Sequence, residues 1–440
     1  MQKNILRLFD FSLKINGFKI DKAKLTLSEI QAKTNSEFET YVEEQKKAII
    51  SYHLKHNSFY KTLGKTIDLN VWNSVPIITK KHLQQPLEQR LSDGFTTKNV
   101  YINKTSGSSG DPFIFAKDKW CHAMTWVQIM NRFGWYGIDF NTSKQARFYG
   151  IPLDKKGYYK ERLKDFFSNR FRFSVFDLSD AAFETALKKF KTDNFEFING
   201  YTSPIVQFAK FLKQKDIVLT TVCPTLKVCI VTSEMLFDDD KILMEIQFGV
   251  PVVNEYGASE LDLIAFQNTD DEWQVNNETL YVEILDKNDA VLPFGEEGRI
   301  VITSLYNKAH PLIRYDIGDI GSLSEKSTMR KPILKKLVGR TNDIAILPSG
   351  KKAAGLTFYY ITKSVIENDG NVSEFVIEQL KLDHFKIRFV SRAELSKAKK
   401  NIIMVEMERY LEPGITVSFE RVEKLKRTKA GKLKQFISKL

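Results

Sequence analysis

Short apolar runs that favour β-strands alternate with helical patterns between residues 98 and 255, and this alternation constrains the fold more than any other feature. The strand-like runs are 144–149, 195–199, 226–232 and 252–255, and the helical patterns are 181–192, 203–214 and 238–248. Strands that alternate with helices of this length are typical of layered α/β structure. The sequence therefore predicts a layered α/β domain in this part of the chain.

The segments on either side of this core have different patterns. Residues 1–95 are mainly helical, with a cap predicted at Ser36 and helical spacing through Ile50. The segment 75–80 interrupts that pattern and is predicted to open another helix. Residues 272–325 carry hairpin signals. A last module is predicted from about 343, with strands at 375–378, 385–390 and 417–422 and a helix at 396–410.

A chain of 440 residues is too long for one ordinary core, so two or more domains are expected. Apolar residues make up 42% of the chain and include 32 Phe, which is enough to fill substantial cores. We predict a large N-terminal α/β domain over 1–341, with a β-rich subdomain, and a small α+β domain over 342–440.

The net charge of +12 raises nucleic acid or an anionic membrane as partners. The lysines, however, are spread along the chain among Asp and Glu, and no basic run carries the interleaved aromatic residues of a single-strand binder. We interpret the charge mainly as solubility and attraction for anionic substrates, and expect no nucleic-acid partner.

The cysteine content points to a reducing compartment. Cys121, Cys223 and Cys229 form an odd, sparse set without the paired ligands of a zinc site, and the last two are expected to be buried. No apolar stretch of signal-peptide length opens the chain, and nowhere do eighteen apolar residues follow one another. We expect a cytoplasmic protein without a transmembrane segment.

Residues 103–112 read Asn-Lys-Thr-Ser-Gly-Ser-Ser-Gly-Asp-Pro, a segment suited to holding a polyphosphate. Gly107 and Gly110 can adopt positive φ and let backbone N–H groups converge on an anion. Hydroxyl donors are added by Thr105, Ser106, Ser108 and Ser109. The segment lacks the Gly-Lys-Ser/Thr of a Walker motif, and an ordinary Ser/Gly turn is the alternative.

Two later segments end predicted strands with polar residues. Ser233 follows one strand, at the edge where ligands of open α/β folds collect. In the second, Tyr256 can stack on adenine, Gly257 allows close approach, and Glu260 offers an oxygen ligand to Mg²⁺. Tyr256 could equally be a packing residue at a strand end.

Three further residues complete the set. Asp319 follows a glycine and is suited to accepting hydrogen bonds from a ribose diol, Arg340 lies at the predicted domain joint, and Lys432 lies next to Gly431 in a basic tail. Each has an ordinary structural alternative, such as a turn cap or a solvated charge. The residues predicted to bind nucleotide are Thr105, Ser106, Gly107, Ser108, Ser109, Gly110, Ser233, Glu255, Tyr256, Gly257, Ser259, Asp319 and Arg340.

The order of these segments resembles the adenylate-forming superfamily of acyl-CoA synthetases, in particular its phenylacetate–CoA ligase and CapK branch. The resemblance spans roughly residues 70–440. Residues 256–260 are similar to the family's Tyr-Gly-x-Ser/Thr-Glu signature, and 427–432 to its terminal Arg-Thr-x-x-Gly-Lys. Residues 75–80 resemble the Pro-x-x-Thr-Lys of the phenylacetate branch, whereas 346–352 look more like capsule-associated relatives.

The resemblance implies an acyl-CoA synthetase-like fold and an ATP- and Mg²⁺-dependent ligase that forms an acyl-adenylate. Lys432 and Glu260 would be catalytic, and Tyr201 and Ala258 would line the acyl pocket. A mobile C-terminal domain would rotate about Asn342, which departs from the acidic or lysine residue common at that position.

The acceptor is open at this stage. Transfer of the acyl group to a thiol such as CoA is the first hypothesis, and transfer to an amine in surface-polysaccharide synthesis is the second. A catalytically silent scaffold and a nucleic-acid binder are alternatives from other classes. The carboxylic acid and the oligomeric state do not follow from the sequence.

Overall fold

The structure is a computed structural model that describes residues 7–63, 67–105, 113–150, 155–340, 344–354, 372–427, 433–434 and 436–440. Its described residues form two compact units. The first contains the chain up to residue 317 and residues 322–335, and the second contains 318–321 and the chain from 336. The predicted α/β class is confirmed. The predicted domain boundary at 341 and the mobility of the C-terminal domain stay predictions.

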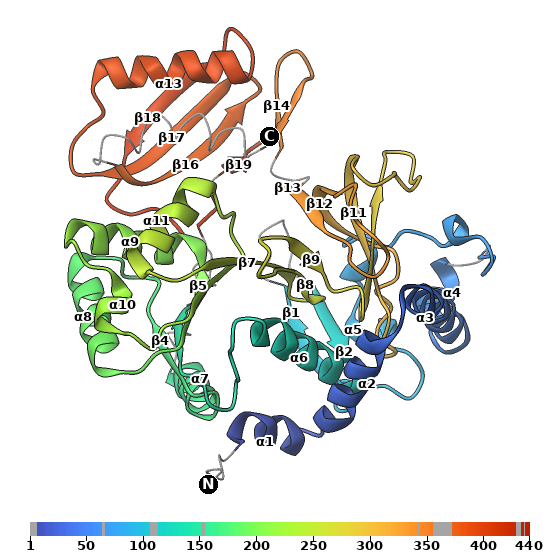
Figure 1. The fold of residues 1–440 in the computed structure, drawn as a ribbon. Helices are drawn as coiled ribbons and strands as arrows, with labels where there is room; N and C mark the ends of the chain where they lie inside the picture. Colours follow the sequence, from blue (N-terminus) through green and yellow to red (C-terminus); the bar gives the residue numbers. More distant parts are fainter. Residues whose placement is uncertain are drawn as a thin grey trace. The chain divides into compact units, whose positions relative to one another are not determined.

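A seven-stranded sheet is the centre of the first unit, with strand order β4-β3-β5-β6-β7-β8-β9 (Figure 1). The strands are β3 (Gln145–Phe148), β4 (Arg170–Phe173), β5 (Phe197–Tyr201), β6 (Val228–Thr232), β7 (Val252–Ala258), β8 (Asp262–Gln267) and β9 (Trp273–Val275). The pairs from β4 to β7 are parallel, and those from β7 to β9 are antiparallel. Every residue of β5 and β6 is buried, which is typical of parallel strands covered on both faces.

Helices cover this sheet, and aromatic side chains fill the space beneath them. The helices are α6 (Lys119–Gly134), α7 (Lys155–Phe167), α8 (Asp180–Thr192), α9 (Thr202–Gln214), α10 (Leu219–Val222) and α11 (Asp238–Phe248). Phe148 of β3 and Phe208 of α9 belong to one core cluster, and Phe133 of α6 packs with Phe197 of β5 in another. The strands and helices predicted between 144 and 255 are confirmed, with boundary shifts of a few residues.

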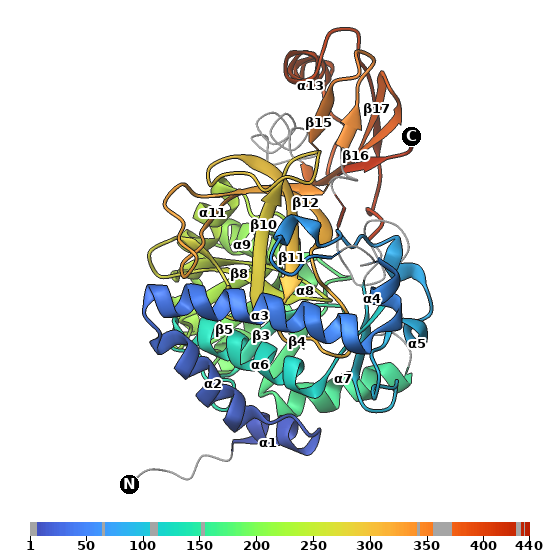
Figure 2. The same ribbon diagram turned by 90° about the vertical axis from the view of Figure 1, so that its right-hand side faces the viewer.

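The N-terminal region is helical, as predicted. Its elements are α1 (Leu8–Ile15), α2 (Ile20–Ala32), α3 (Asn35–His56), α4 (Ser58–Leu63), α5 (Leu87–Arg90) and the 3-10 turns η1 (Trp72–Ser74) and η2 (His82–Gln84). Figure 2 shows α2 alongside α6, against which it packs. The cap predicted at Ser36 is wrong: Thr34 caps α3 through a reciprocal capping box with Glu37.

The helix predicted to open at 75–80 is also wrong. Ile78 instead forms a parallel bridge with Tyr315, and its N–H donates to the carbonyl of Arg314 at 3.0 Å. The Arg314 guanidinium donates to the carbonyl of Val75 at 3.0 Å. These main-chain bonds are made with a distant segment, so no local helical pattern could reveal them.

Two smaller β structures complete this region. The hairpin of β1 (Tyr101–Lys104) and β2 (Ile114–Lys117) is antiparallel. A four-stranded sheet has the order β10-β11-β12-β13, formed by β10 (Leu280–Leu285), β11 (Glu297–Ser304), β12 (Tyr315–Leu323) and β13 (Leu334–Arg340). The β10–β11 pair is the hairpin that the sequence predicted.

The second unit holds a four-stranded sheet of order β18-β17-β16-β19 and one helix. These elements are β16 (Val372–Lys381), β17 (His384–Ser391), α13 (Lys397–Tyr410), β18 (Thr416–Arg421) and β19 (Phe436–Ser438). A separate hairpin joins β14 (Ile344–Ile346) and β15 (Lys352–Ala354). Ser396 caps α13, and buried Ile403 and Met407 line the inner side of that helix. The α+β pattern predicted for this region is confirmed.

The cysteine and membrane-span predictions can be compared with the described residues. Cys121, Cys223 and Cys229 are all buried and free. Within the described ranges, none of the helices combines the length and the apolar character that crossing a bilayer requires.

Candidate active site

The parallel sheet brings three predicted residues to one edge. Tyr201 at the end of β5 is opposite Thr232 of β6, and Thr232 is opposite Glu255 of β7. Ser233 follows directly, exposed and with φ of +70°. Because the carboxyl ends of parallel strands meet at one edge, Tyr201, Ser233 and Glu255 converge as the sequence predicted.

This edge combines aromatic rings, one buried and one partly buried, with charged groups. The rings of Tyr149 and Tyr201 lie 4.5 Å apart, and the Arg147 guanidinium lies 4.1 Å from the Tyr149 ring centroid. Burial raises the pKa of Tyr201 to about 12. Burial also raises the pKa of Glu255, while a hydrogen bond with Thr232 and the charge of Arg147 oppose the increase. The environment is therefore poorly solvated, which strengthens electrostatic interactions with a bound group.

The Tyr-Gly-Ala-Ser-Glu segment runs from the end of β7 into the turn before β8. A Cβ on Gly257 would lie 2.4 Å from the carbonyl oxygen of Asp262, so the close approach of the two strands requires glycine. Tyr256 is 7% exposed and packs edge-on against Trp273 with ring centroids 5.9 Å apart. Ala258 is partly exposed and Ser259 is exposed. Stacking of Tyr256 on adenine stays a prediction.

Glu260 is a buried carboxylate, 4% exposed, at the tip of this turn. The Tyr315 hydroxyl donates a hydrogen bond to its Oε1 at 2.8 Å. No lysine or arginine in the described part of the chain forms a salt bridge with Glu260. A neutral hydroxyl therefore supports this carboxylate where a buried charge would ordinarily require a cation.

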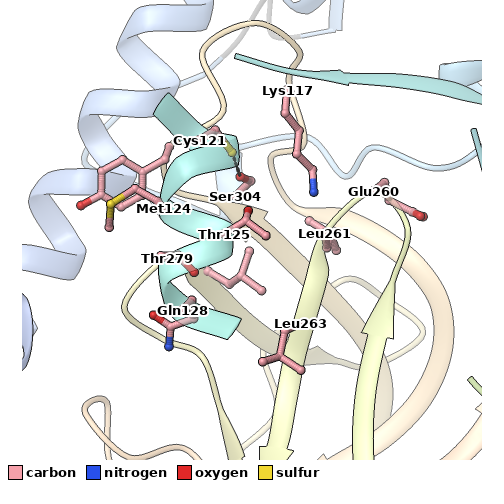
Figure 3. Close-up of a pocket in the computed structure, with 12 residues that line it drawn as sticks. Lys117, Cys121, Met124, Thr125, Gln128, Glu260, Leu261, Leu263, Thr279 and Ser304 are labelled. Carbon is pink, nitrogen blue, oxygen red and sulfur yellow. Dashed lines mark hydrogen bonds between the residues drawn. The ribbon is translucent and has the colours of Figure 1, made fainter. Parts of the chain in front are cut away.

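Lys117 ends β2 beside the same turn and is buried. Its ammonium forms an ion pair with Asp262, on the β8 side of the turn. Figure 3 shows the Lys117 ammonium directed at the turn, while the Glu260 side chain extends away from it. Burial lowers the pKa of Lys117 to about 8, and the charges of Cys121 and Glu260 oppose the decrease.

A cavity adjoins this turn on the α6 side (Figure 3). Its volume of about 10 Å³ is room for about one water molecule. Cys121, Gln128, Leu263 and Ser304 contribute to its walls together with Lys117. The cavity is too small for an acyl group, and the predicted pocket residue Tyr201 does not line it.

Magnesium can be tested against these residues. No group of three His, Cys, Asp or Glu side chains that could hold a metal ion occurs within the described ranges. Mg²⁺ in nucleotide sites is commonly held by one or two carboxylates, phosphate oxygens and waters. The single buried carboxylate of Glu260 fits that arrangement and does not fit a metal cage made by protein alone.

The glycine–hydroxyl segment connects β1 to β2, and its ends are joined. The N–H of Thr105 donates to the carbonyl of Phe113 at 3.0 Å, and the N–H of Phe113 donates to the Thr105 hydroxyl oxygen at 3.1 Å. The predicted ligands Ser106, Gly107, Ser108, Ser109 and Gly110 lie outside the described residues. Their role in phosphate binding stays a prediction.

The remaining predicted residues are on other elements. Asp319 lies on β12 and is 7% exposed. The preceding residue, Gly318, has a φ of +83°. Arg340 is the last residue of β13. Asn342 and Lys432 lie outside the described residues. Arg427, the last described residue before Lys432, pairs with Glu374 of β16.

Sequence reasoning missed Lys117 and Asp262 and gave Tyr315 no role. The one local signal for Lys117 is a charged residue at the end of the apolar run 113–116. Its ion pair with Asp262 spans 145 residues of chain, and the Tyr315–Glu260 hydrogen bond spans 55.

Known proteins are similar to this chain in sequence and in fold. Protein CapK of Staphylococcus aureus is 24% identical over 422 residues, which cover 92% of this chain and 88% of CapK. A phenylacetate–coenzyme A ligase of Aromatoleum evansii is 30% identical over 131 residues, 28% of this chain and 29% of that protein. No protein-family model matches the chain.

The solved structure of 2-hydroxyisobutyryl-CoA ligase in the postadenylation state, with an acyl-AMP bound, superimposes with a TM-score of 0.69. The match covers 92% of this chain and 90% of that one at 16% identity. The resemblance to the adenylate-forming ligases is confirmed. At this identity the likeness of structures establishes the acyl-CoA synthetase-like fold and leaves the substrate and the acceptor open.

Proposed function

We propose that this protein is an ATP-dependent ligase that activates a carboxylic acid as an acyl-adenylate. The observation that carries the proposal is the position of Glu260. This buried carboxylate forms no salt bridge with a described lysine or arginine, and it lies in a segment matching the Tyr-Gly-x-Ser/Thr-Glu signature on the fold of adenylate-forming ligases. The similarity to CapK along nearly the whole chain supports the proposal.

In the proposed first step, a carboxylate oxygen of the substrate attacks the α-phosphorus of ATP, and the bond to the β-phosphate oxygen breaks to release pyrophosphate. Two anions must approach, and negative charge develops on the leaving group. Glu260 would hold Mg²⁺, which supplies positive charge to the phosphates. Backbone N–H groups of residues 107–110 and the Lys432 ammonium would add to that charge.

The other predicted residues have roles in the same proposal. Asp319 would accept hydrogen bonds from the ribose, Tyr256 would contact adenine, and Ser233 and Glu255 would border the nucleotide at the sheet edge. Arg340 would contact the phosphates, while Tyr201 and Ala258 would face the acyl group. Rotation of a C-terminal domain about Asn342 would then exchange Lys432 for the acceptor.

In the second step a nucleophile attacks the acyl carbonyl carbon and AMP leaves. We propose a thiol, most simply that of CoA, as the nucleophile. The alternative is an amine in surface-polysaccharide synthesis. Preformed enzyme–adenylate supplied with CoA or with amino sugars separates the two, because only the true acceptor releases AMP with formation of a thioester or an amide.

The first step is tested by pyrophosphate exchange with a panel of carboxylic acids. We expect exchange with at least one acid, and Glu260→Gln should lower its rate by roughly 10²–10³-fold, since the amide cannot offset the metal charge. Glu39→Gln on the exposed face of α3 is the matched control and should be neutral. Normal exchange by Glu260→Gln, or no acid-dependent exchange by the wild type, would refute the proposal.

A further inference from the structure

Helix α7 exposes three large apolar residues, while its two acidic residues are held against the protein by ion pairs. Tyr159, Leu163 and Phe166 are 70%, 60% and 71% exposed. Their spacing of four and then three residues places them on one face of the helix. Three large apolar side chains in one solvent-facing stripe indicate a contact surface.

The opposite face of α7 is held to the protein by charge. Asp165 accepts hydrogen bonds from Arg170 at 2.5 Å and from Arg172 at 2.9 Å, and Glu161 accepts from Arg172 at 2.8 Å. The arginine charges contribute to holding the pKa of both carboxyls below the ordinary range, although burial opposes this. These ion pairs fix the rotation of α7 about its axis, so the stripe is kept outward.

Helix α1 packs against α7 and also exposes large apolar side chains. Phe11 and Ile15 are 55% and 69% exposed, whereas Phe9 and Leu13 on the other side of α1 are buried. The surface, which we name the α1–α7 stripe, consists of Phe11, Ile15, Tyr159, Leu163 and Phe166. Both helices lie along one margin of the first unit in Figures 1 and 2.

The sequence of α7 is basic. The thirteen residues of α7 contain four Lys and one Arg against one Glu and one Asp, a formal charge of +3, and both acids are engaged by arginines of β4. The whole chain carries +12. An exposed apolar stripe on a helix whose sequence is rich in Lys and Arg is typical of helices that lie in the interface of an anionic bilayer.

We propose that the α1–α7 stripe docks this protein on the surface of a membrane that contains anionic lipids. A second copy of the chain is a poorer occupant, because an isologous contact would bring two helices of charge +3 together. The proposal concerns peripheral binding and does not depend on the proposed ligase activity.

The chain offers a matched control on α11. Ile242 and Ile246 are 54% and 59% exposed and also lie four residues apart, but α11 contains four acids and one Lys, a formal charge of −3. The two helices therefore present apolar stripes of comparable exposure with opposite charge.

The test is co-sedimentation of the full chain with vesicles of phosphatidylcholine, alone or with about a third phosphatidylglycerol. We expect roughly tenfold or stronger binding to the anionic vesicles, weakened by high salt, and a similar loss in the Leu163→Ser/Phe166→Ser variant. The Ile242→Ser/Ile246→Ser variant should bind like the wild type. Urea unfolding of both variants checks that these exposed substitutions leave the fold intact.

Equal binding to both vesicle types, or equal loss in the two variants, would overturn the proposal. The proposal would also be overturned if the wild type bound no vesicles and light scattering showed that it is a dimer, while Leu163→Ser/Phe166→Ser is a monomer. That result would make the stripe a contact between copies.

Discussion

Glu278 and Glu260 are both buried glutamates of the first unit, and they are compensated in opposite ways. Glu278 is 7% exposed, and both of its carboxylate oxygens accept hydrogen bonds from the Arg132 guanidinium at 2.7 Å. The side-chain amides of Gln31 and Gln128 donate further hydrogen bonds to it. Burial opposes ionisation of Glu278, but the charge and hydrogen bonds of Arg132 hold its pKa below the ordinary value. Glu260 has a neutral hydroxyl at 2.8 Å in the described structure.

The difference separates a carboxylate that is fully paired within the protein from one that forms no salt bridge in the described structure. The Arg132–Glu278 pair joins α6 to the segment before β10, and Gln31 of α2 ties a further helix to it. Nothing is left for a ligand to supply at Glu278. Glu260 forms no salt bridge with a described lysine or arginine, and in the proposed function this buried carboxylate would hold the metal of a metal–nucleotide complex.

The largest expected effect contrasts the two residues directly. Glu278→Gln leaves the Arg132 guanidinium buried without its counterion and should lower the free energy of unfolding by about 3–5 kcal/mol. Glu260→Gln replaces a carboxylate that forms no salt bridge by a neutral amide and should change the free energy of unfolding by less than about 1 kcal/mol. Urea denaturation measures both. If the two variants lost the same free energy of unfolding, Glu260 would be a structural charge like Glu278.

A second prediction tests whether burial of an ionisable group without a charged partner makes the free energy of unfolding depend on pH. His53 is fully buried, with Nε2 2.9 Å from the carbonyl oxygen of Asn307. Burial lowers its pKa from 6.5 to about 4, and the bond to Asn307 opposes the decrease. The folded state therefore keeps His53 neutral while the unfolded chain takes up a proton, so stability is full above pH 6.5 and is lost as the pH falls toward 4.

The expected contribution of His53 over that range is about 3 kcal/mol. Urea denaturation in steps from pH 7 to pH 4 should show a shallower decline in His53→Gln than in the wild type. His56→Gln, at a partly exposed position on the same helix, is the control and should follow the wild-type curve. An unchanged slope in His53→Gln would mean that the imidazole is protonated in the folded protein.

Most of the fold could be predicted because periodicity is local information. The alternating pattern from 144 to 255 gave the sheet and its helices, and strand ends alone placed Tyr201, Ser233 and Glu255 on one edge. The two failures came from competing partners. Thr34 rather than Ser36 is the N-cap of α3, because the Glu37 side chain accepts a hydrogen bond from the Thr34 backbone N–H. In the segment 75–80, Ile78 pairs with Tyr315 at the start of β12.

The buried charges could not be predicted in the same way. Whether Glu260 is compensated depends on Tyr315 and on the pairing of Lys117 with Asp262, and each of these contacts joins distant parts of the chain. The residue types at those positions are visible in the sequence, but their distances are not. A motif therefore identified the carboxylate, and only the structure indicated why its charge is available.

The smallest expected effect concerns the hydroxyl that supports Glu260. Tyr315 is fully buried, and Tyr315→Phe removes the donor to Oε1 while keeping the ring in the core. We expect the free energy of unfolding to fall by about 0.5–1.5 kcal/mol. Pyrophosphate exchange should slow by roughly tenfold or less, since the carboxylate remains but loses its orientation.

Tyr60→Phe is the matched control for this substitution. Tyr60 is also fully buried, but its hydroxyl has no hydrogen-bond partner in the described structure, so its removal should leave stability unchanged or raise it slightly. If Tyr315→Phe behaves like Tyr60→Phe in both measurements, the hydroxyl does not position Glu260. If Tyr315→Phe slows exchange as strongly as Glu260→Gln, the tyrosine itself contacts the reacting groups, and the neutral support inferred for Glu260 is the wrong description of this site.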